Sequence, residues 1–81
     1  MKISELINEL EKMKKEYGDI GVIYGSGDDT IDFIKAKKYI ISYNPYHQTR
    51  QMDTEDLNQN YLEEAYSKND ILDSGIVIKI H

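Results

Sequence analysis

The chain contains no cysteine or tryptophan and only one proline, one arginine and one phenylalanine among its 81 residues. Without cysteine, neither a disulfide nor a thiolate metal site can form, so the fold must rest on packing or on association. No window approaches the roughly 18 apolar residues of a membrane-spanning helix, and the first residues lack the apolar run of a signal peptide. We therefore expect a cytoplasmic protein without a membrane span.

Positive charge is also scarce. Ten basic residues stand against fifteen acidic ones, which gives a net charge of −5. Neutralising phosphates requires a basic stripe, so the sequence argues against direct binding of nucleic acid. An acidic surface can instead steer a small protein toward a basic groove on a partner, although acidity can also serve solubility alone.

Catalytic and metal-binding patterns are missing as well. The two histidines suggest no pairing with a nucleophile and no metal triad. Asp28, Asp29 and Asp32 could hold a hard cation, but their spacing lacks the alternating ligands of an EF-hand, and a solvated turn is the favoured interpretation. The two aspartates of "GSGDDT" would also repel phosphate. The sequence thus predicts no enzyme, cofactor or metal site.

The residues that are present predict one α+β domain over residues 1–81. A helix is expected over 4–17, capped by Ser4 and ended by Gly18. Its inner side is formed by apolar residues three and four positions apart: Ile3, Leu6, Ile7, Leu10, Met13 and Tyr17.

A short strand is expected over 20–24, paired antiparallel with the next strand. In "IDFIKAKKYIISY" we expect a bulge, or two strands meeting near 36–38, with Ile31, Phe33, Tyr39, Ile41 and Tyr43 on one face. A second helix over 54–67, capped by Asp53 or Thr54, and a final strand in "IVIKIH" complete the order α-β-β-α-β. The expected sheet is small and mainly antiparallel, with about three to four strands.

Seven tyrosines are the main anomaly of composition. Five are expected in the core: Tyr17, Tyr24, Tyr39, Tyr61 and Tyr66. The other two, Tyr43 and Tyr46, lie with His47 and Arg50 in "SYNPYHQTRQ", which we expect to be a loop. Such a loop could stack a planar ligand and hold an anion, or present contact residues to a protein. A plain polar connection is equally compatible with this stretch.

The opening "MKISELINELEKMKKEYGDIGVIYG" resembles small, mostly uncharacterised proteins of phages and prophages of AT-rich bacteria, many of which look like inhibitors of host defence. The resemblance implies a non-enzymatic, anti-CRISPR-like inhibitor in the bacterial cytoplasm. Its acidic residues would face a basic surface of a host defence protein; they include Asp28, Asp29, Asp32, Glu63 and Glu64.

Two alternatives stay open. The first is a sponge that sequesters a nucleotide immune signal with Tyr43, Tyr46, His47 and Arg50. The second is an interaction or structural module of another kind. We also expect a homodimer, formed by pairing the edge of the isoleucine-rich last strand or by burying a tyrosine face.

Overall fold

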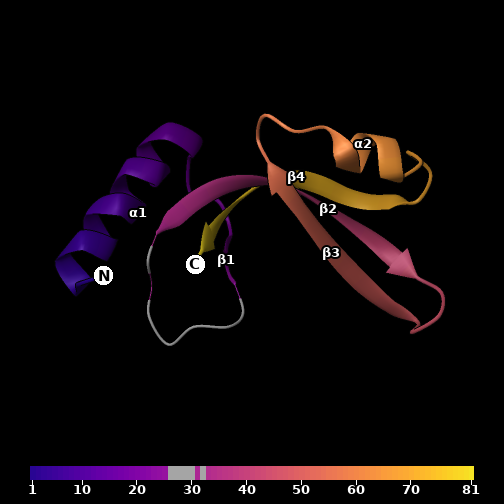
Figure 1. The fold of residues 1–81 in the computed structure, drawn as a ribbon, viewed down its shortest axis with the longest axis horizontal. Helices are drawn as coiled ribbons and strands as arrows, with labels where there is room; N and C mark the ends of the chain where they lie inside the picture. The colour runs from indigo at the N-terminus through magenta and orange to yellow at the C-terminus, as the bar shows by residue number, and fades with distance from the viewer. Residues whose placement is uncertain (26–30, 32) are drawn as a thin grey trace. The chain divides into compact units, whose positions relative to one another are not determined.

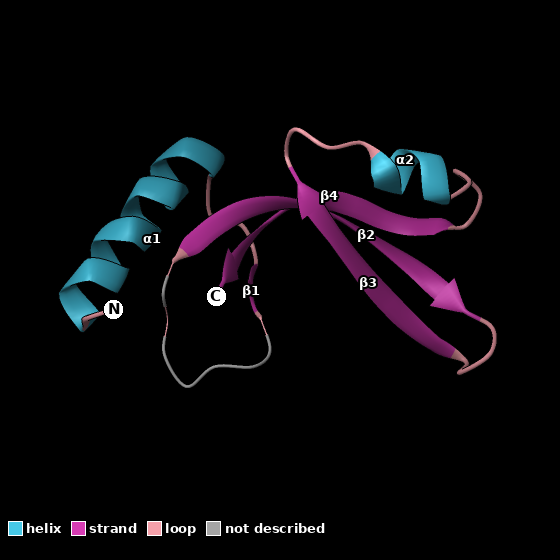
Figure 2. Cartoon of the chain, viewed as in Figure 1, coloured by secondary structure: helices cyan, strands magenta, loops and turns pink. Residues whose placement is uncertain are grey.

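The computed structural model describes residues 1–25, 31 and 33–81, and it has an α+β fold of two helices and a four-stranded sheet (Figures 1 and 2). The elements in chain order are α1 (Ile3–Tyr17), β1 (Val22–Tyr24), β2 (Ile34–Asn44), β3 (Thr49–Asp56), α2 (Tyr61–Ala65) and β4 (Ile71–Ile80). The chain divides into unit 1 (Met1–Ala36 and Ile76–His81) and unit 2 (Lys37–Gly75).

The sheet is mixed, with the hydrogen-bonded order β1-β4-β2-β3. β1 is parallel to β4, with Val22 opposite Ile78, and β2 is antiparallel to β3. The predicted α+β class and two helices are confirmed, whereas the predicted antiparallel pairing of the first two strands is wrong. The short β1 finds its partner near the other end of the chain, a long-range pairing that no local signal encodes.

Helix α1 agrees with the predicted 4–17 to within one residue. It carries Glu5 in its first turn and lysines in its last, as the helix dipole favours. The predicted cap by Ser4 is wrong, because the N-cap is Lys2 and has no side-chain hydrogen bond. Gly18 ends the helix with φ 88° and ψ −172°, and its N–H donates to the carbonyl of Lys14 at 2.9 Å. This backbone region is essentially restricted to glycine.

The core of unit 1 consists of Ile34, Ala36 and Ile78, which are all buried. The α1 residues that contact this core are those three or four positions apart: Leu6, Leu10, Met13 and Tyr17. Ile3 and Ile7, also expected on the inner side, are exposed by 80% and 49%. The amphipathic pattern therefore identified the correct side of the helix but overestimated its buried width.

In unit 2, β2 and β3 run side by side in opposite directions to a tight turn (Figure 1). β2 is one continuous strand, so the predicted bulge or break near 36–38 is wrong. The buried face of this part of β2 is the one that carries Ile40 and Ser42, whereas Tyr39, predicted in the core, lies half-buried on the other face with the exposed Tyr43. Successive side chains of a strand alternate between its two faces, so residues 40 and 42 point to one side of the sheet and residues 39, 41 and 43 to the other.

The predicted helix over 54–67 is largely replaced by other structure. Residues Thr54–Asp56 belong to β3, Leu57 is exposed in a turn, and α2 is only five residues long. Leu62 is the buried residue of α2, with 3% of its surface exposed.

Two of the five tyrosines assigned to the core are exposed instead, Tyr24 by 84% and Tyr61 by 48%.

Candidate functional site

The stretch "SYNPYHQTRQ" forms the end of the β2–β3 hairpin, so the predicted loop is a four-residue turn (45–48) between paired strands. The Oδ1 atom of Asn44 accepts hydrogen bonds from the N–H groups of Tyr46 (2.9 Å) and His47 (3.4 Å). Its Nδ2 atom donates to Oε1 of Gln51 on the opposite strand at 3.0 Å. Asn44 thereby supplies the side-chain turn that replaces a backbone turn here.

The hairpin brings together two of the predicted site residues, Tyr43 and Arg50. They are direct cross-strand partners, so their side chains leave the same face of the sheet. Tyr46 and His47 lie in the turn and are exposed, Tyr46 by 94%. Among the residues that the structure describes, none forms an ion pair or side-chain hydrogen bond with Arg50. Asp28, Asp29 and Asp32 lie outside the described residues.

We call the face that carries this pair the open face of unit 2. Its cross-strand pairs are Tyr39 with Thr54, Ile41 with Met52 and Tyr43 with Arg50. Tyr43 is 52% exposed and Met52 41% exposed, so this face presents large apolar side chains to solvent. The sequence interpretation missed Met52, because this residue lies between the predicted loop and the predicted second helix. The signal that could have found it is the alternation of residues 50, 52 and 54.

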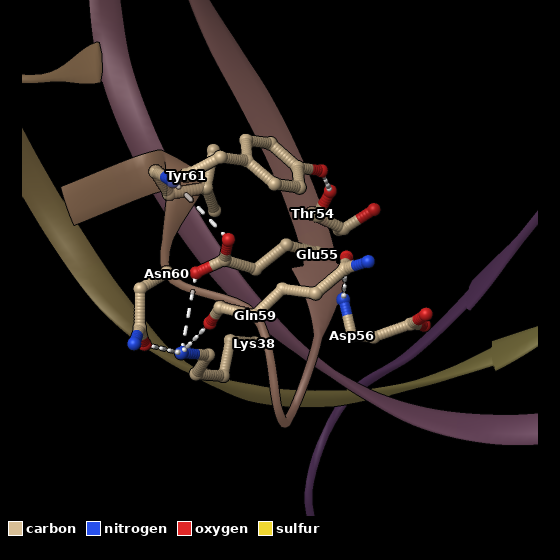
Figure 3. A network of polar contacts seen from close by, with 8 residues as sticks. Lys38, Thr54, Glu55, Asp56, Gln59, Asn60 and Tyr61 are labelled. Carbon is tan, nitrogen blue, oxygen red and sulfur yellow. Dashed lines mark hydrogen bonds and ion pairs between the residues drawn. The ribbon is translucent and has the colours of Figure 1, made fainter. Parts of the chain in front are cut away.

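The opposite face of the hairpin carries a polar network (Figure 3). The Nζ atom of Lys38 lies 3.2 Å from Oε1 of Glu55 and 3.2 Å from Oδ1 of Asn60, and it donates to the backbone carbonyl of Gln59. Glu55 is only 2% exposed, and its Oε2 atom accepts the N–H of Leu62 at 3.1 Å. Since both carboxylate oxygens have partners, the network can hold the start of α2 on β3.

The first residue of α2 and the turn before it also bond to the outer edge of β3. The Tyr61 hydroxyl donates to the carbonyl of Thr54 (Figure 3). The N–H of Asp56 donates to Oε1 of Gln59 at 3.4 Å, and the N–H of Gln59 donates to the carbonyl of Asp56 at 3.0 Å. The second half of β3 is therefore bonded along its outer side.

Two tyrosines donate hydrogen bonds to carboxylates, Tyr39 to Asp73 (3.1 Å) and Tyr66 to Asp53. Each hydrogen bond raises the pKa of its phenol above 10.0, and desolvation and the negative charge of the carboxylate raise it further. Both phenols therefore stay protonated at neutral pH, where they act as hydrogen-bond donors.

In unit 2, some charged side chains form ion pairs, whereas others are exposed to solvent. Lys37 pairs with Asp56 at 3.3 Å, and Lys38 pairs with Glu55. Glu63 and Glu64 are exposed in the first turn of α2, and neither forms an ion pair with any residue in the described ranges. The acidic excess of unit 2 is therefore presented at its surface, while two of its four basic side chains are engaged internally.

No helix within the described part of the chain is long and apolar enough to cross a membrane. Comparisons with protein-family models, curated proteins and solved structures gave no match for this chain.

Proposed function

We propose that the protein is a non-enzymatic binding protein that inhibits a component of host bacterial defence by applying its acidic surface to a basic surface of the target. The observation that carries this proposal is the internal pairing of Lys37 and Lys38. Because these two lysines neutralise Asp56 and Glu55, they leave Glu63 and Glu64 uncompensated on the outside. Exposed charge of one sign raises the rate of encounter with a surface of the opposite sign.

The class of target comes from the resemblance of the first 25 residues to small phage and prophage proteins. A protein of this kind needs no catalytic group, because it acts by occupying a functional surface of its target. The exposed side chains of the open face and of the turn add aromatic contact area in the same unit.

The proposal is tested by infecting a bacterium that carries an active defence system while this protein is expressed. We expect the wild-type protein to restore plaque formation. The double variant Glu63→Lys/Glu64→Lys should lose this effect, whereas Glu63→Gln/Glu64→Gln should retain part of it. Both variants should melt like wild type, because exposed substitutions change stability by less than about 0.5 kcal/mol.

A matched control is Lys68→Gln, which removes an exposed positive charge from the same unit and should leave inhibition unchanged or stronger. The proposal is wrong if no defence system is inhibited, or if the charge-reversed variant inhibits as well as wild type. Binding to the identified target should also weaken as salt is raised, because exposed charges are screened.

A second candidate function is sequestration of a nucleotide immune signal, favoured by the position of Arg50 opposite Tyr43. An exposed guanidinium next to an aromatic ring can bind a phosphate and stack a base. Mass spectrometry of the extract from the denatured, freshly purified protein would detect a retained nucleotide, which Arg50→Ala should lose. An extract free of nucleotide, obtained from cells with an active signal, would rule this function out.

A further inference from the structure

The outer edge of β3 has a bonded half and an open half. In an antiparallel ladder, the N–H and C=O groups of successive residues point alternately toward and away from the partner strand. The outer groups of Thr54 and Asp56 are bonded by Tyr61 and Gln59, so the even-numbered residues of β3 point away from β2. Arg50 and Met52 have the same parity, and their N–H and C=O groups therefore also point outward.

β3 is the last strand in the order β1-β4-β2-β3, so no strand of the sheet lies beyond it. Within the described residues, no hydrogen bond reaches the outward groups of Arg50 and Met52. Two donors and two acceptors are thus presented in a row, next to an edge that α2 and its preceding turn have closed. An edge strand of this kind is a template for pairing with another chain.

We propose that the open half of β3 pairs antiparallel with the same segment of a second copy of this chain, with Gln51 opposite Gln51 on a two-fold axis. In this register, Arg50 lies opposite Met52 of the second copy, and Met52 lies opposite Arg50. All four outward groups of each copy are then bonded. Sliding the pairing by two residues would instead bring Arg50 opposite Thr54, whose carbonyl already accepts the Tyr61 hydroxyl.

The charges of the strand are compatible with a second copy in this register. No like charges lie directly opposite each other, since Gln51 faces Gln51 and Thr49 faces Asp53. A shift that placed Asp53 opposite Asp53 would bring two carboxylates together. The pairing also joins the open faces of the two copies, because each Arg50 acquires Met52 of the other copy as a neighbour. In the dimer the two open faces would therefore form one continuous surface.

The proposed edge differs from the one expected from the sequence. The isoleucine-rich last strand, β4, lies between β1 and β2, and β1 pairs with its residues Ile78–Ile80. The homodimer remains a prediction, and we expect it to form through the open half of β3.

The register can be tested by cross-linking. The chain has no cysteine, so Gln51→Cys introduces a unique thiol on the proposed axis. Residues facing each other there form a non-hydrogen-bonded pair with Cα atoms about 4.5 Å apart, which is within the range of a disulfide. Oxidation should convert most of the protein to a covalent dimer of twice 9.4 kDa.

Thr49→Cys is the matched control, because it lies on the same side of β3 but about 13 Å from its own copy in this register. It should remain largely monomeric under the same oxidation. Equal cross-linking of the two variants, or none with Gln51→Cys, would overturn the proposed register.

Sedimentation equilibrium provides an independent test without a new thiol. The wild-type mass should rise above 9.4 kDa as the concentration increases from tens of micromolar to millimolar. Met52→Pro removes an outward N–H while leaving the ladder with β2 intact, as proline does at sheet edges. This variant should dimerise roughly ten-fold or more weakly, because two of the four intermolecular hydrogen bonds are lost.

Met52→Ala keeps the N–H and should dimerise more tightly than Met52→Pro. A wild-type mass of 9.4 kDa at millimolar concentration, or equal association of folded Met52→Pro and wild type, would contradict the proposal. If Met52→Pro does not fold, the cross-linking of Gln51→Cys decides the matter by itself.

Discussion

The ring of Tyr39 on β2 lies against Gly75 on β4. A Cβ atom placed on Gly75 would be 3.0 Å from Cε1 of Tyr39 and 3.3 Å from its hydroxyl oxygen. That hydroxyl donates a hydrogen bond to Oδ2 of Asp73 at 3.1 Å. The missing side chain of Gly75 therefore makes room for an aromatic ring that crosses to the neighbouring strand.

Gly75→Ala should destabilise the protein, because the added methyl group would displace the ring of Tyr39. Overpacking of this kind costs about 1–3 kcal/mol, measurable as a lower midpoint of urea unfolding. In a Tyr39→Ala background the new methyl group has space, and the same substitution should become neutral or stabilising, since alanine is favoured over glycine within a strand. An equal cost in both backgrounds would contradict this account.

Lys38→Met should be destabilising, because it leaves the buried carboxylate of Glu55 without its cation. Breaking a fully buried pair costs about 3–5 kcal/mol, and partial exposure of Lys38 should place the effect near the lower end. The double variant Lys38→Met/Glu55→Gln should be more stable than Lys38→Met, since glutamine still accepts the N–H of Leu62 but carries no charge. Urea unfolding of wild type, Lys38→Met and the double variant measures the three stabilities. A double variant less stable than Lys38→Met would contradict this prediction.

The stability of the protein should fall as the pH rises above 10. The pKa of Tyr66 is raised in the folded state by its hydrogen bond to Asp53, so above pH 10.0 the unfolded chain loses this proton first. The stabilising contribution is complete below the unfolded pKa and disappears as the pH passes the folded pKa. Thermal melting across this range, with tyrosinate absorbance to follow ionisation, would show the decline.

Asp53→Asn provides the matching control for the pH effect. Without the carboxylate, Tyr66 should titrate closer to its ordinary pKa, and the loss of stability above pH 10.0 should be less steep than in wild type. Tyr66→Phe, which removes the titrating group, should flatten the curve in the same way. Parallel curves for all three proteins would show that other groups dominate this range.

Asn44→Ala should destabilise the hairpin, whereas Tyr46→Ala should not. Asn44 accepts two backbone N–H groups of the turn, and the loss of such a side-chain turn costs about 1 kcal/mol. Tyr46 is 94% exposed, so its truncation should change stability by less than about 0.5 kcal/mol. Urea unfolding separates the two outcomes. A large cost for Tyr46→Ala would mean that its ring belongs to the folded framework.

Much of α1 could be predicted from the sequence because its signals are local. The spacing of Leu6, Leu10 and Met13 defines one side of a helix wherever it packs, and Gly18 ends it through its own backbone freedom. The acidic balance of the chain is likewise fixed by composition alone. Tyr43 and Arg50, predicted to belong to one surface, are cross-strand partners, and their role in binding stays a prediction.

The identity of β3 was decided only by tertiary structure. Residues 53–56 carry helix-capping side chains and read locally as the start of a helix, but pairing with β2 extends them into a strand. Lys38 and Glu55 form an ion pair at the end of β3, and the helix begins only at Tyr61. Helix signals repeat within a few residues of one another, whereas strand pairing depends on a partner elsewhere in the chain. The sequence alone therefore determined α1 and the charge, and the fold decided which face of the hairpin is open.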